Sequence, residues 1–346
     1  MNRSFALLGA ATLALVGCQD NADRGGGTAR DRIRVVGSST VYPYTTAVAE
    51  AFARKTPGTA APIVESTGTG AGMKQFCGGV GASFPDIANA SRRIKASEYA
   101  DCEKNGVKDI VEIQIGIDGI TLAQSKAGPA LDLTEADIYK ALAANPYGKP
   151  QTAKTWRDVN PALPAIAIQV YGPPPTSGTR DAFAELVLEK GCDADPATKA
   201  TADKDEKKAI CTKLREDGAY VESGENDNLI VQKLGANPNS VGIFGYSFLE
   251  ENEATLRGVP IQGVAPTYES IASYKYPGAR PLYIYVKAAH LTAIPGLKGF
   301  VTEYASAWGP DGYLKRRGLV VAPDDVRQAN LAIATNMTPL DPASIK

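Results

Sequence analysis

The sequence has very little histidine and no excess of charge of either sign. It contains one histidine, His290, which is predicted to lie at the surface or to cap a helix. A single imidazole excludes a metal site with several histidines and any mechanism that needs two of them. Lysine and arginine together number 37, and aspartate and glutamate 38, so the formal net charge is −1. This balance gives no electrostatic reason to expect a nucleic-acid partner.

Motifs of two common enzyme classes are also missing. The sequence contains neither the G-x-S-x-G motif of nucleophile elbows nor the G-x-x-x-x-G-K-[ST] motif of P-loops. The stretch Gly68-Thr69-Gly70-Ala71-Gly72 departs from the G-x-G-x-x-G spacing of dinucleotide-binding loops. We therefore expect a protein that is not an enzyme and that holds neither a cofactor nor a metal ion.

The amino terminus begins with an apolar run over 5–16 that is too short to span a bilayer, which takes about 20 residues. Its length is typical of a secretory signal segment. The run ends in Leu15-Val16-Gly17-Cys18, which resembles the lipobox of bacterial lipoproteins. We predict a signal peptide over 1–17, lipidation of Cys18 and a flexible tether over 18–31, which would anchor the protein to a membrane in the periplasm or at the cell surface. The alternative is an ordinary signal peptide with an incidental cysteine.

Four cysteines remain once Cys18 is assigned to the lipid, namely Cys77, Cys102, Cys192 and Cys211. Four cysteines allow three connectivities, and the sequence leaves them open. Pairing neighbours, Cys77 with Cys102 and Cys192 with Cys211, closes the shortest loops and is our hypothesis. Zinc binding is the rival interpretation, but the sequence contains no C-x-x-C pair.

Several β-prone runs are each followed by a turn rich in serine, threonine or glycine and then by a helical pattern. The β-prone runs are Ile33–Val36, Pro62–Val64, Asp86–Ala88 and Ile166–Val170. Strands that alternate with helices predict an α/β fold with mostly parallel sheets. The charged run Lys204–Lys208 is typical of a solvated helix face.

The turns between these strands and helices share a chemical character. Serine and threonine cap helix N-termini, and glycine lets the backbone approach a ligand. A helix N-terminus presents unpaired N–H groups and the positive end of a dipole. Two of the turns carry an adjacent arginine, Arg92 and Arg180. The pattern therefore indicates an oxyanion-binding site.

Taken in order, the turns resemble those of the PstS-like phosphate-binding proteins of bacterial ABC importers. The segments that carry the resemblance are Val36–Pro43, Gly68–Lys74, Ala90–Arg92, Ser177–Phe183 and Ser240–Tyr246. The resemblance implies a type II periplasmic-binding fold, with two α/β lobes joined by two crossing strands and phosphate in the cleft. Lobe one would comprise 32–118 and 285–346, and lobe two 119–284. The crossing strands would be Ile117–Leu122 and Arg280–Tyr285.

The resemblance also assigns phosphate-binding residues to these turns. They are Ser39, Thr40, Thr69, Ser91, Arg92, Ser177, Gly178, Thr179 and Arg180. Where the best-known members have an aspartate that accepts the phosphate proton, this chain has Ser91-Arg92, and where they have an arginine it has Pro173. Arg92 is the candidate replacement for that arginine. The proton acceptor stays open between Asp181 and Asp227.

The function implied by the resemblance is capture of inorganic phosphate, lobe closure and delivery to the membrane permease of an ABC importer, by a monomer. Residues alone do not decide between phosphate and sulfate, molybdate or arsenate. A further alternative is a surface lipoprotein that acts on phosphate esters or has an adhesive role.

Overall fold

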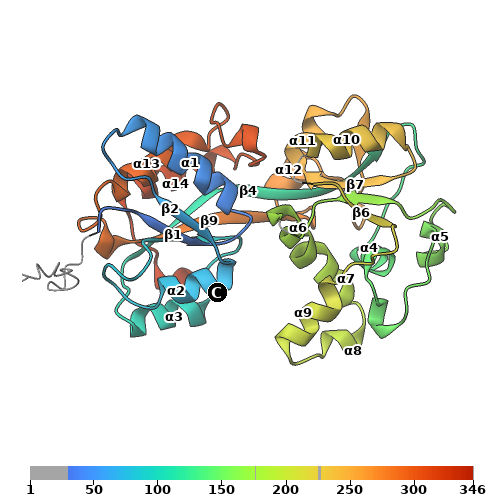
Figure 1. The fold of residues 1–346 in the computed structure, drawn as a ribbon, viewed down its shortest axis with the longest axis horizontal. Coiled ribbons are helices and arrows are strands. Elements are labelled where there is room, and N and C mark those ends of the chain that lie inside the picture. Colours follow the sequence, from blue (N-terminus) through green and yellow to red (C-terminus); the bar gives the residue numbers. More distant parts are fainter. Residues whose placement is uncertain (1–29, 176, 225–226, 346) are drawn as a thin grey trace, which may run out of the picture.

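The computed structural model describes residues 30–175, 177–224 and 227–345. The predicted signal peptide, the lipidation site Cys18 and nearly all of the predicted tether therefore lie outside the described residues. Within those residues, no helix is long and apolar enough to cross a membrane. Figure 1 shows two lobes, with the long strand β4 (Ile110–Ser125) passing from one to the other.

The strands and helices alternate along most of the chain. The remaining strands are β1 (Arg34–Gly37), β2 (Ile63–Ser66), β3 (Ile87–Ala90), β5 (Val170–Gly172), β6 (Tyr220–Glu222), β7 (Val241–Gly245), β8 (Leu256–Gly258) and β9 (Ala279–Lys287). The helices of lobe one are α1 (Tyr42–Lys55), α2 (Thr69–Phe76), α3 (Ala96–Lys104), η3 (Ala288–His290), α13 (Leu297–Ala307), η4 (Lys315–Arg317), α14 (Asp324–Asn336) and η5 (Pro342–Ser344).

The helices of lobe two include one long helix that changes type along its length. They are α4 (Glu135–Leu142), η1 (Pro146–Gly148), α5 (Trp156–Val159), α6 (Gly178–Phe183), the π-helical η2 (Ala184–Leu188), α7 (Glu189–Cys192), α8 (Pro196–Lys199), α9 (Lys204–Thr212), α10 (Asp227–Ala236), α11 (Tyr246–Glu251) and α12 (Tyr268–Ala272). The α6, η2 and α7 segments follow one another without a break. The predicted α/β class is confirmed.

The strands form a sheet in the order β2-β1-β3-β9-β4-β7-β5-β6, with β8 also paired to β4. The strand pairs away from the centre of the sheet are parallel. In lobe one β1 pairs with β2 and β3, and in lobe two β5 pairs with β6 and β7. Every pairing of β4 or β9 is antiparallel. The expectation of mostly parallel sheets is thus wrong at the centre, because strands that cross between the lobes in opposite directions must pair antiparallel.

The two predicted crossing segments lie in β4 and β9 (Figure 1). The first part of β4 pairs with β9 as far as Gly119, opposite Ala279. From Ile120, opposite Gly245, β4 pairs with β7 instead. One strand therefore belongs to both lobes, and the fold has the expected hinge of two crossing strands.

Each lobe has its own buried apolar core. Val35, Ile113 and Phe300 belong to the core of lobe one, where α1 and α13 cover the sheet. The lobe-two core includes Trp156 and Phe183, together with Val320 from the carboxyl-terminal segment. Val320 reaches it because it forms an isolated bridge with Ile117 on β4. The carboxyl-terminal segment therefore packs on lobe one and also on the hinge.

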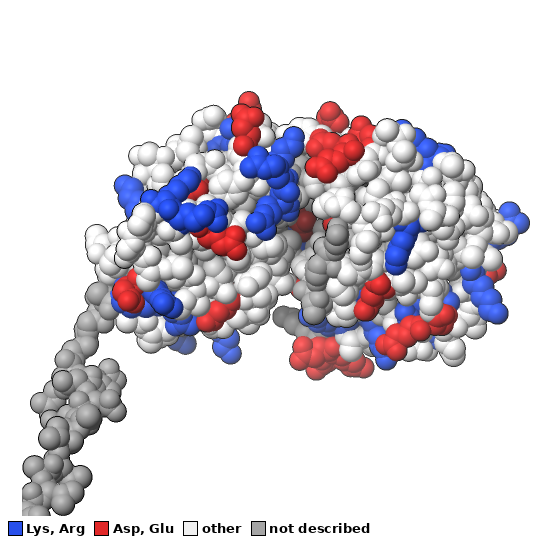
Figure 2. All heavy atoms as spheres, turned by 45° about the horizontal axis from the view of Figure 1, so that its top comes forward, with Lys and Arg blue, Asp and Glu red and all other residues white. Residues whose placement is uncertain are grey.

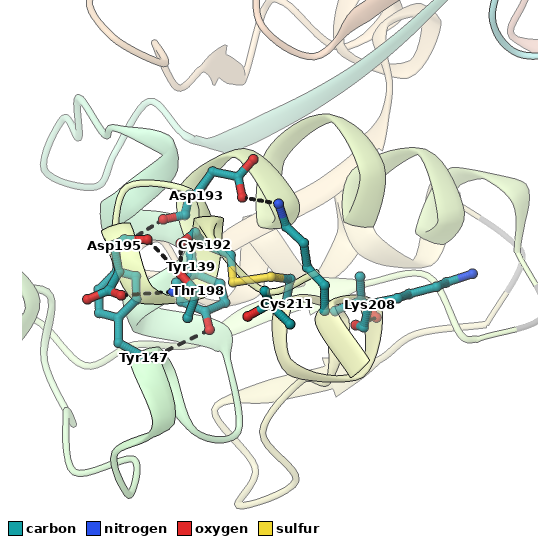
Figure 3. Close-up of a disulfide and its surroundings, with 12 residues drawn as sticks. Tyr139, Tyr147, Cys192, Asp193, Asp195, Thr198, Lys208 and Cys211 are labelled. Atoms are coloured by element: carbon teal, nitrogen blue, oxygen red, sulfur yellow. Dashed lines mark hydrogen bonds and ion pairs between the residues drawn. A yellow bond between two sulfur atoms is a disulfide. The ribbon is translucent and has the colours of Figure 1, made fainter. Parts of the chain in front are cut away.

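Both disulfides pair neighbouring cysteines, as the loop-length argument predicted. Cys77–Cys102 joins the end of α2 to α3, and Cys192–Cys211 joins α7 to α9 (Figure 3). All four side chains are buried. Each bridge lies within one lobe, so neither restricts movement between the lobes.

Two local predictions were wrong. Of the run Ile166–Val170, only Val170 belongs to β5, because Ala167 pairs at a single bridge with Thr155 and the ladder to β6 begins at Val170. His290 is buried and not at the surface. Its ring Nδ1 lies 2.6 Å from Oδ1 of the buried Asp86, and Nε2 accepts from the N–H of Gly81 at 3.0 Å.

Charged side chains lie over both lobes (Figure 2). Figure 2 shows basic side chains gathered on lobe one beside the gap between the lobes, with acidic side chains across the gap on lobe two. Exposed charges near this junction include Lys315 on η4 and Glu250 on α11, which line one small hollow. The lobe surfaces thus approach each other with opposite charge on this face.

Candidate functional site

A cavity of about 110 Å³ lies between the lobes at the ends of several turns. Lobe one lines it with Ser38, Ser39, Thr40, Gly68, Thr69 and Ser91. Lobe two lines it with Asp181, Ala184, Glu185, Glu189 and Lys208. The lobe-one lining is made of hydroxyl groups and backbone, whereas the lobe-two lining carries charge.

The first turn follows β1, whose last residue, Gly37, has φ +130°. A Cβ at Gly37 would lie 2.2 Å from the carbonyl oxygen of Asn89, so only glycine fits. The chain then passes Ser39 and Thr40 and enters α1, whose N-cap Val41 makes no side-chain capping bond. The first N–H groups of α1 are nevertheless partnered by Ser38, whose Oγ accepts from the N–H of Val41 at 3.3 Å and whose carbonyl accepts from the N–H of Tyr42 at 3.0 Å.

The second turn leads into a helix whose N-terminus has no side-chain cap. Gly68 adopts φ +78° as the N-cap of α2 and provides no side-chain cap. Thr69 opens the helix, and its Oγ1 accepts from the N–H of Ser91 at 3.1 Å and lies 3.0 Å from Ser91 Oγ. The turns after β2 and β3 are thus joined by hydroxyl groups at the cavity wall.

The lobe-two turn meets lobe one directly. Ser177 caps α6, and its Oγ accepts from the N–H of Thr179 at 3.2 Å. A Cβ on Gly178 would lie 2.7 Å from Cα of Thr40, and the Thr40 hydroxyl donates to the Gly178 carbonyl at 3.2 Å. The Ser39 hydroxyl donates to the carboxylate of Asp181. The lobes are therefore in contact at this turn.

A buried arginine from β9 lies beneath the same turn. Nη2 of Arg280 donates to Oγ1 of Thr40 at 3.0 Å, and Nε donates to Oδ2 of Asp118 at 3.2 Å. Nη1 donates to Glu185, which lines the cavity. Asp118 and Arg280 lie opposite each other on β4 and β9. This guanidinium thus joins both lobes and both crossing strands.

Burial changes the acidity of two carboxyl groups around the cavity. It raises the pKa of Asp118, and the facing Arg280 opposes that shift. It also raises the pKa of Glu189, with the nearby charge of Glu185 adding to the effect. The charges of Lys208 and Lys207 oppose this shift in the pKa of Glu189.

The predicted site residues divide into two groups. Ser39, Thr40, Thr69 and Ser91 line the cavity, and Gly178 packs on Thr40, with Ser177 and Thr179 adjacent. Arg92 and Arg180 are not among the lining residues.

The two predicted arginines have partners elsewhere. Arg92 forms a two-bond ion pair with Glu98 at 2.7 and 2.9 Å. Arg180 donates to the carbonyl of Pro173 at 3.1 Å, and its guanidinium carbon lies 4.7 Å from the ring centroid of Tyr220.

Sequence reasoning missed Arg280, Glu185, Glu189 and Lys208 and left Asp181 as one of two candidates. A signal for Arg280 was present, since Asp118 and Arg280 are charged residues inside two otherwise apolar crossing strands. No comparable signal marked Lys208, because its charged run forms the exposed helix that was predicted. Only the course of the chain between Cys192 and Cys211 brings that helix to the cavity.

Comparison with known proteins identifies the family of this chain. Residues 22–307 match the family model described as "PBP superfamily domain". The chain is 31% identical over 296 residues to the phosphate-binding protein PstS of Staphylococcus saprophyticus, covering 84% of this chain and 81% of that protein. It is 33% identical over 259 residues to protein SphX of Synechococcus elongatus, covering 72% of this chain and 66% of that protein.

A solved structure supports the same relationship. The crystal structure of a possible phosphate binding protein from Planctomyces limnophilus matches with a TM-score of 0.71 at 32% identity, covering 88% of this chain and 98% of that one. The chain therefore belongs to the PBP superfamily and, within it, to the family of PstS-like phosphate-binding proteins.

Proposed function

We propose that this protein is the phosphate receptor of an ABC importer, lipidated at Cys18, which binds inorganic phosphate between its lobes and delivers it to a membrane permease. The observation that carries the proposal is the meeting of the α2 N-terminus, which has no side-chain cap, with hydroxyl groups from three turns at one small cavity. Such an N-terminus attracts anions through its unpaired N–H groups and its dipole. The names of the relatives support phosphate as the anion.

The size of the cavity favours a small ion over a phosphate ester. About 110 Å³ has room for several water molecules and thus for one tetrahedral oxyanion, with little left for a sugar or a base. The proposal is therefore binding without turnover, by a monomer whose lobes, 32–118 with 285–346 and 119–284, move about β4 and β9.

The guanidinium of Arg280 is the proposed cationic partner of phosphate. It already bonds Thr40 at the cavity wall and Glu185 in the lining. The side chain of Glu185 is 51% exposed, so it can move into solvent when an anion enters. The ion pair with Asp118 keeps the guanidinium in position. A bidentate contact to phosphate would then replace the contact to Glu185.

Asp181 is the proposed acceptor of the phosphate proton. It lines the cavity and already accepts a hydrogen bond from Ser39. Phosphate at neutral pH keeps a proton to donate, whereas sulfate has none, so a carboxylate facing an oxygen rejects sulfate. Sulfate, molybdate and arsenate, and activity on phosphate esters, are the alternatives to be tested.

Calorimetric titration of the anion-stripped protein tests the proposal. We expect stoichiometric phosphate binding, much weaker sulfate binding and no hydrolysis of a chromogenic phosphate ester. Arg280→Lys keeps the charge but loses the planar fork, and should weaken phosphate binding about ten- to a hundredfold, since charge-assisted hydrogen bonds contribute about 1.5–3 kcal/mol each. Absence of phosphate binding by the folded parent protein would refute the proposal.

The roles predicted for Arg92 and Arg180 are checked in the same titrations. A loss of about ten- to a hundredfold in Arg92→Ala or Arg180→Ala would mean that these side chains leave Glu98 and Pro173 to bind the anion. If both variants bind phosphate with an affinity within twofold of the parent protein, Arg280 is the arginine of the site.

A further inference from the structure

A disulfide-closed segment of lobe two extends over the cavity. After α7 ends at Cys192, the chain forms α8 and α9 and returns to Cys211, which bonds Cys192 (Figure 3). The bridge is buried against Tyr139 and Ala143. Near it, Nζ of Lys207 lies 2.6 Å from Oδ1 of Asp193. This segment is a small clasp that fixes α9 to the end of the long helix.

The disulfide attaches α9 covalently to the end of α7. Among the described side chains of this helix, Cys211 is the one that is buried. The other residues of α9 are mostly charged, and Ile210 packs, partly buried, beside the bridge. A covalent link within a 19-residue separation therefore restricts where α9 can lie.

Lys208 is the part of this clasp that lines the cavity. Of the described lining residues, it is the one with a cationic side chain, among the carboxylates of Asp181, Glu185 and Glu189. In Figure 3 its side chain extends away from the disulfide. Within the described part of the chain, no carboxylate lies within ion-pair distance of Lys208. Its exposed ammonium group is therefore available to an entering anion.

The charge of the lining creates a need for such a cation. An anion that enters the cavity meets three carboxyl groups from lobe two and only hydroxyl and backbone groups from lobe one. Arg280 lies beneath Thr40 and is shared with Asp118. Charges at a solvent-exposed rim act through a screened field, so the contribution of Lys208 should depend on ionic strength.

We propose that Lys208 is a phosphate-binding residue, positioned over the cavity by the Cys192–Cys211 bridge. The cation attracts phosphate into an otherwise acidic cleft and contacts it when the lobes close. Reduction of the bridge frees α9 and removes the cation from its place. This inference rests on the proposed function, because it assigns a further residue to the same site.

Phosphate titrations of two matched lysine variants test the role of the cation. Lys208→Met should lower phosphate affinity about fivefold or more at low ionic strength, and the deficit should shrink at high salt. Lys199→Met is the control, because Lys199 is an exposed lysine of the same clasp that does not line the cavity. It should stay within twofold of the parent protein.

The role of the bridge is tested by a double-mutant cycle. Cys192→Ser with Cys211→Ser should lower affinity about as much as Lys208→Met, and adding Lys208→Met to it should have little further effect. If the cysteine variant does not fold by circular dichroism, the parent protein and Lys208→Met are titrated with and without a mild reductant. The reductant should then weaken binding by the parent protein and leave Lys208→Met unchanged.

The outcomes separate the two proposals. A parent protein that binds phosphate while Lys208→Met matches it at every ionic strength overturns this inference alone. The same holds if Lys199→Met loses as much affinity as Lys208→Met, or if loss of the bridge leaves affinity unchanged. A folded parent protein that binds no phosphate overturns the proposed function and this inference with it.

Discussion

At the residue scale, Asp181 is the side chain expected to set the choice between phosphate and sulfate. Asp181→Asn replaces an acceptor with an amide that can donate, so it should lower phosphate affinity about tenfold and raise sulfate affinity. Competition calorimetry with both anions measures the change. Asp227→Asn, the other candidate from the sequence, is the comparison. If Asp227→Asn alters the selectivity and Asp181→Asn does not, the assignment of the proton acceptor is reversed.

A second residue-scale prediction concerns Lys287, which is completely buried in lobe one. Burial lowers its pKa to about 7, and the charge of Asp86 opposes the shift while Arg30 adds to it. Its Nζ donates to the carbonyl of Gly79 at 2.6 Å and lies 4.9 Å from the ring centroid of Phe76. Below the folded pKa, the protein therefore holds a buried charge that costs stability.

The sign of the pH dependence follows from linkage. Between about pH 7 and the ordinary lysine pKa of 10.5, the unfolded chain binds the proton more than the folded protein does, so this group makes stability rise with pH. Lys287→Met should be more stable than the parent protein by the largest margin near pH 6, and the margin should shrink toward pH 9. Urea unfolding across this range measures it, with the exposed Lys298→Met as control. Parallel pH profiles for the parent protein and Lys287→Met would contradict the prediction.

At the element scale, the start of α6 is where the two lobes touch. In Gly178→Ala, the new Cβ would lie 2.7 Å from Cα of Thr40 and 2.8 Å from the carbonyl oxygen of Ser39. Both are backbone atoms, so the lobes must separate to make room. We expect phosphate affinity to fall about tenfold with little change in melting temperature, because alanine is a good helix former in α6 itself.

The matched control for Gly178→Ala is Gly235→Ala in α10. A Cβ at Gly235 has no neighbouring atom within 4 Å. This change should stabilise the helix by roughly 0.5–1 kcal/mol and leave affinity unaltered. Equal phosphate affinities for the two variants, measured by calorimetry, would show that contact between the lobes at Gly178 has no part in binding.

At the scale of the whole molecule, the prediction concerns attachment to the membrane. Cys18→Ser removes the proposed lipidation site, so the protein should shift from the membrane fraction to the soluble fraction or remain unprocessed. Several acyl chains hold a protein firmly to a bilayer, whereas an unlipidated tether does not. Fractionation of cells that express each form, followed by mass spectrometry of the amino-terminal peptide, measures this. Membrane association equal to that of the parent protein would contradict lipidation at Cys18.

The sequence by itself determined the features that depend on neighbouring residues. The Ser177 cap, the glycine at the end of β1 and the α/β alternation are each specified within a few positions of the chain, because caps and turns are local hydrogen-bonding choices. The pairing of the cysteines also followed from local loop length. The α/β alternation predicted the fold class, and the family resemblance of the turns assigned four residues that line the cavity, Ser39, Thr40, Thr69 and Ser91.

Only the tertiary structure decided which charges meet. Arg92 pairs with Glu98, while Arg280 crosses from β9 to Thr40 and Glu185, and Lys208 reaches the cavity through the segment between Cys192 and Cys211. Charged side chains are long and find partners across elements, so their contacts depend on how the lobes pack and not on sequence spacing. The hydroxyl and backbone half of the site was therefore predictable from the sequence, and the charged half was not.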